Sequence, residues 1–479
     1  MTKHPKKTIF KWSALAAATF VLAGCASVDI DKTLLDANAP DSATHAFTQG
    51  QLTLSRTGQQ QLARDKLASE LLAKPLGMDE AVQLALTNSP AVQTLLAQSW
   101  ADMAQATQTG RMANPIFNFE RVRAGDELEI GRLLSFGLLD LLTLPQRISI
   151  ATSQVAQARL QLSANVVEQV TQVRQAWVRA VGAQELLAYA QQVNTSAQAS
   201  AELARRMQQV GNFNKLQRAR QQVFYADAIA QLASSQHAVT ATRETLARLL
   251  GLTDMQQLQL QLPERLPDLP KAVREPQVVS SQANTQRLDV QMARSQLDAA
   301  GESQGLNLVT SLIDVELGIR RDTVFDNAEG TRSTRKGYEL DIRLPIFDWG
   351  AAKRDAMNAQ SLAAASRYEG TVRSASSQLR ESYSAYRTAY DIARHYRDEI
   401  VPLRKTMADE NVLRYNCMLI GVFELLADNR SQIASVMAAI NAYQQFWLAD
   451  AALNASLIGK PTSVVMTAAP TSGGEAPGH

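Results

Sequence analysis

The chain has 479 residues and a formal net charge of +2 at pH 7, a balance that excludes nucleic-acid binding through bulk charge. Hydrophobic residues make up 46% and aromatic residues 6%, a composition that excludes an intrinsically disordered chain. Beyond the N-terminal segment there is no run of 18 apolar residues, so we expect no membrane-spanning helix in the rest of the chain.

The N-terminus has the pattern of a secretory signal. Lysines precede an apolar run from Ala14 to Ala23 that is too short to remain in a bilayer. The run ends in Leu22-Ala23-Gly24-Cys25, which resembles a bacterial lipobox. The resemblance implies that residues 1–24 are removed, that Cys25 carries the acyl chains, palmitate among them, and that the protein is sorted to the outer membrane. The alternative is an ordinary signal peptide cleaved near residue 26.

The remainder of the chain contains two similar halves. Three pairs of segments recur in the same order at offsets of about 200 residues, at 92–98 and 290–296, 172–181 and 378–387, and 211–220 and 418–427. We therefore predict an N-terminal anchored extension over 25–76, a first repeat over 77–265 and a second over 275–460. A tail over 461–479, rich in Gly, Pro, Ser and Ala, is predicted to be disordered.

Each repeat contains a region with the period of two that is typical of a half-buried strand. In the first repeat the region is 115–144, where Phe117 and Phe119 alternate with polar residues. In the second repeat we predict strands over about 306–320 and 338–345, joined by a polar loop over 321–337. The segment "LPIFDWG" then leads into a helix, with Pro345 ending the strand ladder and Gly350 allowing the turn.

Very long helices follow the strands. The stretches 146–210 and 351–400 each contain no proline and a single glycine. As a helix, the first of them would extend about 95 Å. A helix of that length needs neighbours along its sides. Turns at about 210–215 and 418–422 are predicted to return the chain in helical hairpins.

The strands have the length and the single apolar face of strands in a membrane β-barrel. The alternative is an antiparallel sheet packed on a soluble core. Four strands cannot close a barrel, and unpaired strand edges are very unfavourable in lipid, so membrane strands would require several chains to share one barrel. The predicted class is mainly α, with a membrane β-barrel part and two structural repeats.

Several segments together resemble the TolC family of outer-membrane efflux proteins. These segments are "ALTNSP" (85–90), "NPIFNF" (114–119), "DLLTLPQR" (140–147), "LPIFDWGAAKR" (344–354) and "RYNCMLIGVFELLADNRSQ" (414–432). The resemblance implies a trimer with a twelve-strand barrel in the outer membrane, continued by an α-helical barrel across the periplasm. The turns depart from the family pattern, since Met418 replaces a usual glycine, and Glu424 in the second repeat and Gln217 in the first replace a usual aspartate.

The resemblance also implies a function and partners. The expected function is the outer-membrane exit duct of a tripartite efflux or type I secretion system, which works with a periplasmic adaptor and an inner-membrane pump. The alternatives are a periplasmic adaptor or a structural coiled-coil envelope lipoprotein. Nucleic acid is not an expected partner, and the histidines and glycine-containing motifs show no metal, phosphate or nucleophile pattern, so neither a cofactor nor an enzyme activity is expected.

By the same resemblance the two helical turns form the periplasmic entrance. The expected turn residues are Gly211, Asn212, Phe213 and Gly421. Glu424 and Asp428 are four residues apart on one helix face and would present a ring of carboxylates to cations, with Gln217 at the corresponding place in the first repeat. The alternative is a solvated face paired with Arg430 or Arg218. Cys417 and Met418 are expected to pack at a helix contact, the less favoured reading being soft ligands for Cu(I).

Overall fold

The computed structural model describes residues 29–39, 42–276, 287–310, 314–343, 346–347 and 349–462. The predicted signal peptide, the acylation site Cys25, Pro345 and the tail from residue 463 lie outside the described residues. The chain divides into two compact units. The first contains Gln98–Arg159 and Asp298–Ser361 with the N-terminus up to Leu35, and the second contains the remaining residues. None of the described helices has a stretch long and apolar enough to cross a bilayer.

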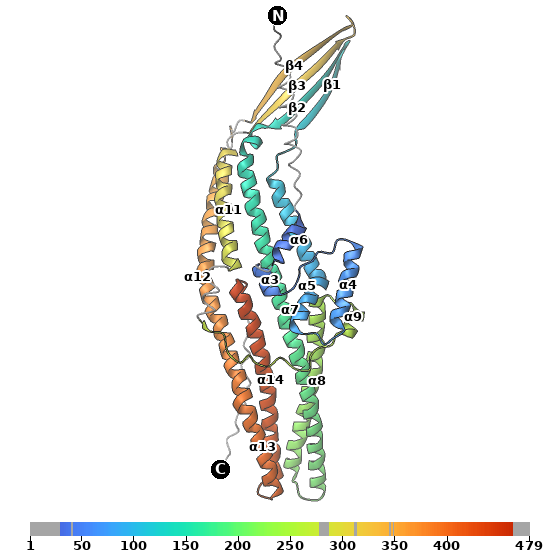
Figure 1. The fold of residues 1–479 in the computed structure, drawn as a ribbon, viewed down its shortest axis with the longest axis vertical. Helices are drawn as coiled ribbons and strands as arrows, with labels where there is room; N and C mark the ends of the chain where they lie inside the picture. The colour runs from blue at the N-terminus through green and yellow to red at the C-terminus, as the bar shows by residue number, and fades with distance from the viewer. Residues whose placement is uncertain are drawn as a thin grey trace, which may run out of the picture. The chain divides into compact units, whose positions relative to one another are not determined.

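The first unit holds a four-stranded antiparallel sheet in the order β1-β2-β3-β4 (Figure 1). Its strands are β1 (Ile116–Ala124), β2 (Glu127–Gly137), β3 (Asp314–Asp326) and β4 (Thr331–Arg343). Each half of the sequence contributes one hairpin, with turns at Gly125 (φ 61°) and Gly330 (φ 65°). The two hairpins join where β2 pairs with β3, which places Leu134 opposite Ile319.

The two faces of this sheet differ in polarity. Residues that are opposite one another share a face, and on one face Phe117, Leu134, Ile319 and Tyr338 form a row across all four strands. The other face carries an ion network around Arg320, whose Nε lies 2.8 Å from Asp322 Oδ2. Its terminal nitrogens lie 3.8 Å from Glu120 Oε2 and 3.7 Å from Glu339 Oε2. One apolar and one polar face is the pattern of a sheet between two different environments.

The ends of the strands differ from the sequence prediction. The segment predicted to begin a strand at 306 is still helical through Thr310, and β3 begins only at Asp314. The predicted loop over 321–337 is mostly strand, because Arg321 pairs with Lys336 and the ladder continues to Asp326 and Thr331. Charged side chains interrupt the alternation of apolar and polar residues in this segment. The backbone hydrogen bonds that define a strand do not depend on that alternation. Residues 138–144 are helical rather than extended.

The long helices lie where they were predicted, with differences at their ends, whereas the helices before residue 77 and the short helix over 254–259 were not predicted. The described helices are α2 (Ile30–Ala37), α3 (Ala43–Thr48), α4 (Gly58–Leu72), α5 (Met78–Asn88), α6 (Pro90–Thr109), α7 (Leu138–Gln209), α8 (Lys215–Leu250), α9 (Asp254–Gln259), α11 (Leu288–Thr310), α12 (Ala351–His395), α13 (Val401–Asn416) and α14 (Val422–Ile458). Helix α7 has 72 residues and is about 110 Å long at 1.5 Å per residue. Gly350 has φ 69° directly before α12, which supports its predicted role at the turn.

The helix predicted over 351–400 does not run straight through. Helix α12 ends at His395, and a π-helical turn, Tyr396–Ile400, separates it from α13. Pro402 explains the interruption, because it lacks an N–H group and its ring would clash with the carbonyl group four residues earlier in an α-helix.

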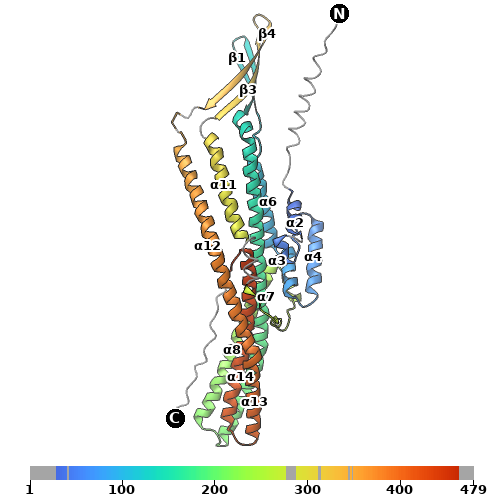
Figure 2. The same cartoon turned by 60° about the vertical axis from the view of Figure 1, so that its left-hand side comes forward.

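In the second unit, helical hairpins pack around aromatic residues. Helices α13 and α14 lie side by side, and so do the lower part of α7 and α8 (Figure 2). Phe446 is fully buried, and its ring centroid lies 5.6 Å from that of Tyr386 and 5.7 Å from that of Tyr390. This aromatic cluster joins α12 to α14 and gives the long helices the lateral packing that they need.

Asn88 of the "ALTNSP" segment holds a helix end. Its buried side-chain amide donates to the carbonyl groups of Leu250 (3.1 Å) and Gly251 (3.0 Å) at the C-terminus of α8. Gly251 has φ 68°, and a Cβ atom there would lie 2.4 Å from Pro90 Cδ. The segment therefore fastens the start of the first repeat to the end of its helical hairpin.

Candidate functional site

The first helical turn follows α7. Gly211, with φ 83°, adopts the left-handed conformation, and the N–H groups of Asn212 and Phe213 donate to the carbonyl of Met207 at 2.9 and 3.2 Å. Gln217, predicted as an entrance residue, has a local structural role. Its side chain accepts from the N–H of Asn214 at 2.8 Å, and its own N–H donates to Asn214 Oδ1, so the two residues form a capping box at the start of α8.

The second turn, between α13 and α14, follows the same path with a different residue at its centre. Met418 has φ 61°, and the next N–H, of Leu419, donates to the carbonyl of Arg414 at 2.8 Å. A non-glycine residue in the left-handed region costs about 1–2 kcal/mol. Gly421 is extended and precedes α14 as its N-cap. Met418 thus occupies the position that Gly211 occupies in the first turn.

The two turns meet through an aromatic pair. The rings of Phe213 and Phe423 have centroids 4.5 Å apart and planes inclined by 32°. Phe213 is buried although its neighbours Gly211 and Asn212 are exposed. Phe423 was not predicted as a site residue, and the repeat gave no signal for it, because the positions that correspond to Phe213 and Phe423 in the other turn are Ile420 and Leu216.

Arg430 connects α14 to the first hairpin. Its guanidinium donates to Gln221 Oε1 at 2.7 Å and to the carbonyl of Arg220 at 3.4 Å, and it lies 4.4 Å from the centre of the Phe224 ring. Burial lowers the pKa of Arg430, and the nearby charge of Arg220 lowers it further, while Asp227 opposes both. Arg430 therefore holds the returning helices α8 and α14 of the two repeats together.

The predicted carboxylates have separate environments. Asp428 is half-buried and accepts a hydrogen bond from the side-chain amide of Asn411 on α13. Glu424 is exposed in the first turn of α14, where the helix dipole stabilises a negative charge. In the described part of the chain the arginines of the alternative have other partners, because Arg430 binds Gln221 and Arg218 donates to Gln208 Oε1 at 2.8 Å.

The ends of the turns expose apolar side chains. Met418 is 92% exposed, and Val210, Leu216 and Leu419 are also largely exposed. Cys417 is exposed as well, so the expected packing of the Cys417-Met418 pair at a helix contact is wrong. Among the described residues no group of three His, Cys, Asp or Glu side chains could hold a metal ion. We refer to Val210, Leu216, Met418 and Leu419 as the apolar tip.

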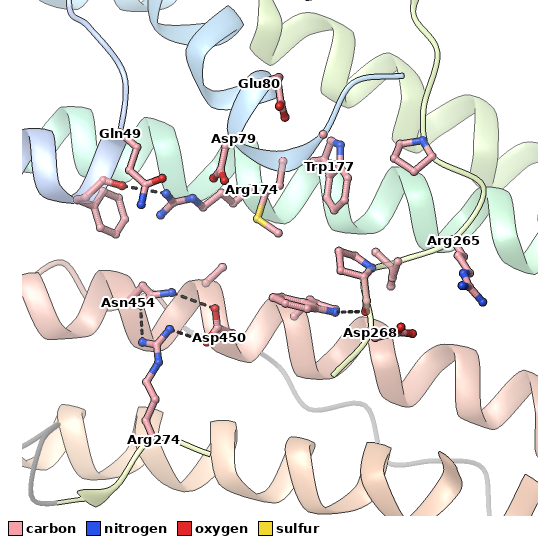
Figure 3. A pocket seen from close by; sticks show the side chains of 18 of the residues that line it. Gln49, Asp79, Glu80, Arg174, Trp177, Arg265, Asp268, Arg274, Asp450 and Asn454 are labelled. Carbon is pink, nitrogen blue, oxygen red and sulfur yellow. Dashed lines mark hydrogen bonds and ion pairs between the residues drawn. The ribbon is translucent and has the colours of Figure 1, made fainter. Parts of the chain in front are cut away.

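A separate polar pocket of about 740 Å³ lies in the second unit between α5, α7, α14 and residues 263–274 (Figure 3). Asp450 accepts from Arg274 at 3.1 Å, and Arg274 also donates to Asn454 at 2.6 Å. Burial raises the pKa of Asp450, and Arg274 and Arg174 oppose that rise.

Residues that line the pocket hold two connecting segments on the helices. Arg174 donates to the carbonyl of Phe47 at 2.8 Å, and the indole N–H of Trp177 donates to the carbonyl of Leu76 at 2.8 Å. The indole N–H of Trp447 donates to the carbonyl of Pro267 at 3.1 Å. The predicted anchored extension and the linker between the repeats are therefore held on α7 and α14.

Comparison with known proteins agrees with this architecture. Residues 279–408 match the sequence profile of the family described as outer membrane efflux protein. No curated protein matches the chain. Among solved structures the chain is similar to the outer membrane protein VceC of Vibrio cholerae, at 16% identity and a TM-score of 0.66, covering 80% of this chain and 96% of that one.

Two further solved structures show the same fold. The CmeC outer membrane channel of Campylobacter jejuni is 14% identical with a TM-score of 0.66, covering 86% of this chain and 89% of that one. The open state of the MtrE outer membrane channel of Neisseria gonorrhoeae is 19% identical with a TM-score of 0.63, covering 81% of this chain and 91% of that one. Residues 279–408 are thus an outer membrane efflux protein domain, in a chain that has the fold of the TolC-like outer-membrane channels.

Proposed function

We propose that the chain is the outer-membrane exit duct of a tripartite efflux or type I secretion system. The observation that carries the proposal is the sheet, which has one apolar and one polar face and is followed in the chain by helical hairpins far longer than a globular core requires. Each repeat, 77–265 and 275–460, contributes one strand hairpin and one helical hairpin. The similar solved structures that are named as outer membrane channels support the same function.

The open sheet supports a homotrimer. Strands β1 and β4 are the edges of the sheet, and their residues are almost all exposed. In lipid each unpaired backbone group would cost several kcal/mol, so the edges must pair with further copies. Three copies of four strands give a twelve-strand barrel with its polar faces inside. The apolar faces would contact outer-membrane lipid, and the helices would form a barrel in the periplasm of a Gram-negative cell.

Reconstitution of the purified full-length chain tests this function. A trimer that resists SDS without heating, together with discrete conductance steps in a planar bilayer, is the expected result. A monomer that inserts into no bilayer would contradict the duct and favour the alternatives, a periplasmic adaptor or a coiled-coil envelope lipoprotein.

We also propose that Cys25 carries the lipid anchor, from the Leu-Ala-Gly-Cys segment at 22–25. Acyl chains add about 0.8 kcal/mol per buried methylene group to membrane attachment. The Cys25→Ala variant should incorporate no radiolabelled fatty acid and still form conducting trimers. Continued labelling of the variant would show that the acyl site is elsewhere.

The apolar tip supports contact with a periplasmic adaptor, which would connect the duct to an inner-membrane pump. Met418 keeps a strained backbone and a 92% exposed side chain, a combination that benefits the isolated chain in no way. The Met418→Gly variant should therefore be about 1 kcal/mol more stable and yet support less efflux. Leu403, exposed on α13 away from the turn, provides the control, since Leu403→Ser should leave efflux unchanged. Full efflux in the Met418→Gly variant would show that Met418 does not take part in the contact with the adaptor.

For the entrance we propose that Glu424 contacts permeating cations and that Asp428 holds the hairpin through Asn411. The exposure of Glu424 and the hydrogen bond of Asp428 support this division. Glu424→Gln should weaken block of the channel current by divalent cations, whereas Asp428→Asn should change it less. Equal block in wild type and Glu424→Gln would exclude Glu424 from the cation path.

A further inference from the structure

All charged side chains on the apolar face of the sheet are cations. The residues that share the face with Phe117, Leu134, Ile319 and Tyr338 follow from the register of the four strands. Its charged members are Arg121, Arg123, Arg132, Arg321, Arg332 and Lys336. The carboxylates Glu120, Glu129, Asp322, Glu339 and Asp341 all lie on the opposite face. Cations such as Arg320 and Arg335 also occur on that opposite face, but among the described side chains of the strands no carboxylate shares the apolar face.

Three of these cations are aligned across neighbouring strands. Arg132 of β2 lies directly opposite Arg321 of β3, and Arg321 lies directly opposite Lys336 of β4. Like charges that face each other across a sheet repel and destabilise it. No ion pair involves any of the three within the described residues, in contrast to Arg320 on the other face, which contacts three carboxylates. The arrangement calls for an anion from outside the chain.

The place of this row indicates what kind of anion it is. Towards the helices, two apolar rows adjoin it, formed by Phe117, Leu134, Ile319 and Tyr338 and by Phe136, Leu317 and Leu340. Phe347 and Trp349 follow the end of β4 and are 99% and 62% exposed. Exposed aromatic residues are typical of the membrane interface of a β-barrel, so this end of the strands fits the opposite interface. Towards the hairpin turns, Arg121, Arg123 and Arg332 add further positive charge.

We propose that Arg132, Arg321 and Lys336 bind the phosphate groups of a lipid in the leaflet on the side of the hairpin turns, with its acyl chains along the apolar rows. The inference rests on the proposed membrane sheet. Positive side chains are strongly unfavourable at the centre of a bilayer and nearly neutral at its interface, so the cation row marks the headgroup level. Only a lipid supplies both the anion for this row and the apolar chains for the rows beside it.

The test measures lipid binding to the full-length trimer in a neutral detergent. The probes are lipid A with both phosphate groups and the same lipid after removal of its phosphates. Wild type should bind the phosphorylated form more tightly, and the triple variant Arg132→Gln, Arg321→Gln, Lys336→Gln should weaken that binding on the order of a hundredfold, or roughly fivefold per cation. An excess of inorganic phosphate should not displace the lipid.

Two further variants separate charge from structure. Arg132→Lys with Arg321→Lys keeps the charges and should retain most of the binding. Arg335→Gln removes a cation from the opposite face of β4, next to Lys336, and should leave binding unchanged. The triple variant relieves repulsion, so it should assemble at least as well as wild type and conduct normally in bilayers of neutral lipid.

Equal binding of both lipid forms by wild type, or unchanged binding by the triple variant, would overturn the inference. If wild type conducts in a planar bilayer, that result leaves the proposed duct intact. If wild type neither conducts nor binds either lipid, both the duct and the lipid site fail.

Discussion

If the proposed entrance opens and closes, Arg430 allows a quantitative test of what keeps it closed. The hydrogen bond of its guanidinium to Gln221, 2.7 Å long, contributes about 1.5–3 kcal/mol as a bond to a charged group. Its position 4.4 Å from the Phe224 ring centre adds about 0.5–1 kcal/mol. Partial burial of the guanidinium, which lowers the pKa of Arg430, opposes both contributions. We take about 2 kcal/mol as the net stabilisation, a value deduced from these typical contributions.

If α14 separates from α8 when the entrance opens, Arg430→Ala should shift the equilibrium towards the open state by about 30-fold. The measurement is the open probability of single channels in a planar bilayer at neutral pH. Gln221→Ala should give a similar but smaller increase, and the double variant should show less than the sum, because both changes remove one interaction.

A matched control is Arg218→Ala, whose guanidinium bonds to Gln208 within the first hairpin and, among the described residues, to no helix of the second repeat. Its open probability should remain that of wild type. An Arg430→Ala channel that also opens no more often than wild type would refute the reasoning, because the contact between α8 and α14 would then persist on opening.

Three further predictions concern stability. Phe446→Ala should lower the free energy of unfolding by about 3–5 kcal/mol, because the buried ring packs on Tyr386, and an unchanged denaturation midpoint would contradict this core. Asn88→Ala should cost about 1–3 kcal/mol, since two helix-end carbonyl groups lose their donor, and Asn88→Asp should not restore them. The pKa of Asp450 is raised above 3.8 in the folded chain, so the folded state binds more protons and the free energy of unfolding should fall as the pH rises from about 4 through the raised pKa. In Asp450→Asn this fall should be reduced, and equal pH slopes for the two proteins would exclude Asp450 as its source.

Much of the fold could be predicted because local patterns report it. Alternation around Phe117 and around Leu340 indicated strands, since a strand between two environments must place its apolar residues on one side. Long stretches without proline indicated the helices, and similar segments about 200 residues apart indicated two repeats. The ends of the strands were missed because Arg321–Lys336 pair through the backbone, which no side-chain pattern reveals.

The contacts of the candidate entrance required the tertiary structure. The sequence by itself determined the turns and the helix face shared by Glu424 and Asp428, because these follow from local spacing along one helix. It did not determine that Arg430 bonds to Gln221, which is 209 residues distant, or that Phe213 meets Phe423. The register of β2 on β3, which aligns Arg132 with Arg321, likewise joins the two repeats. Such contacts depend on how separate helices and strands come together, and the free energy that selects them is a sum over packed surfaces rather than a property of any one segment.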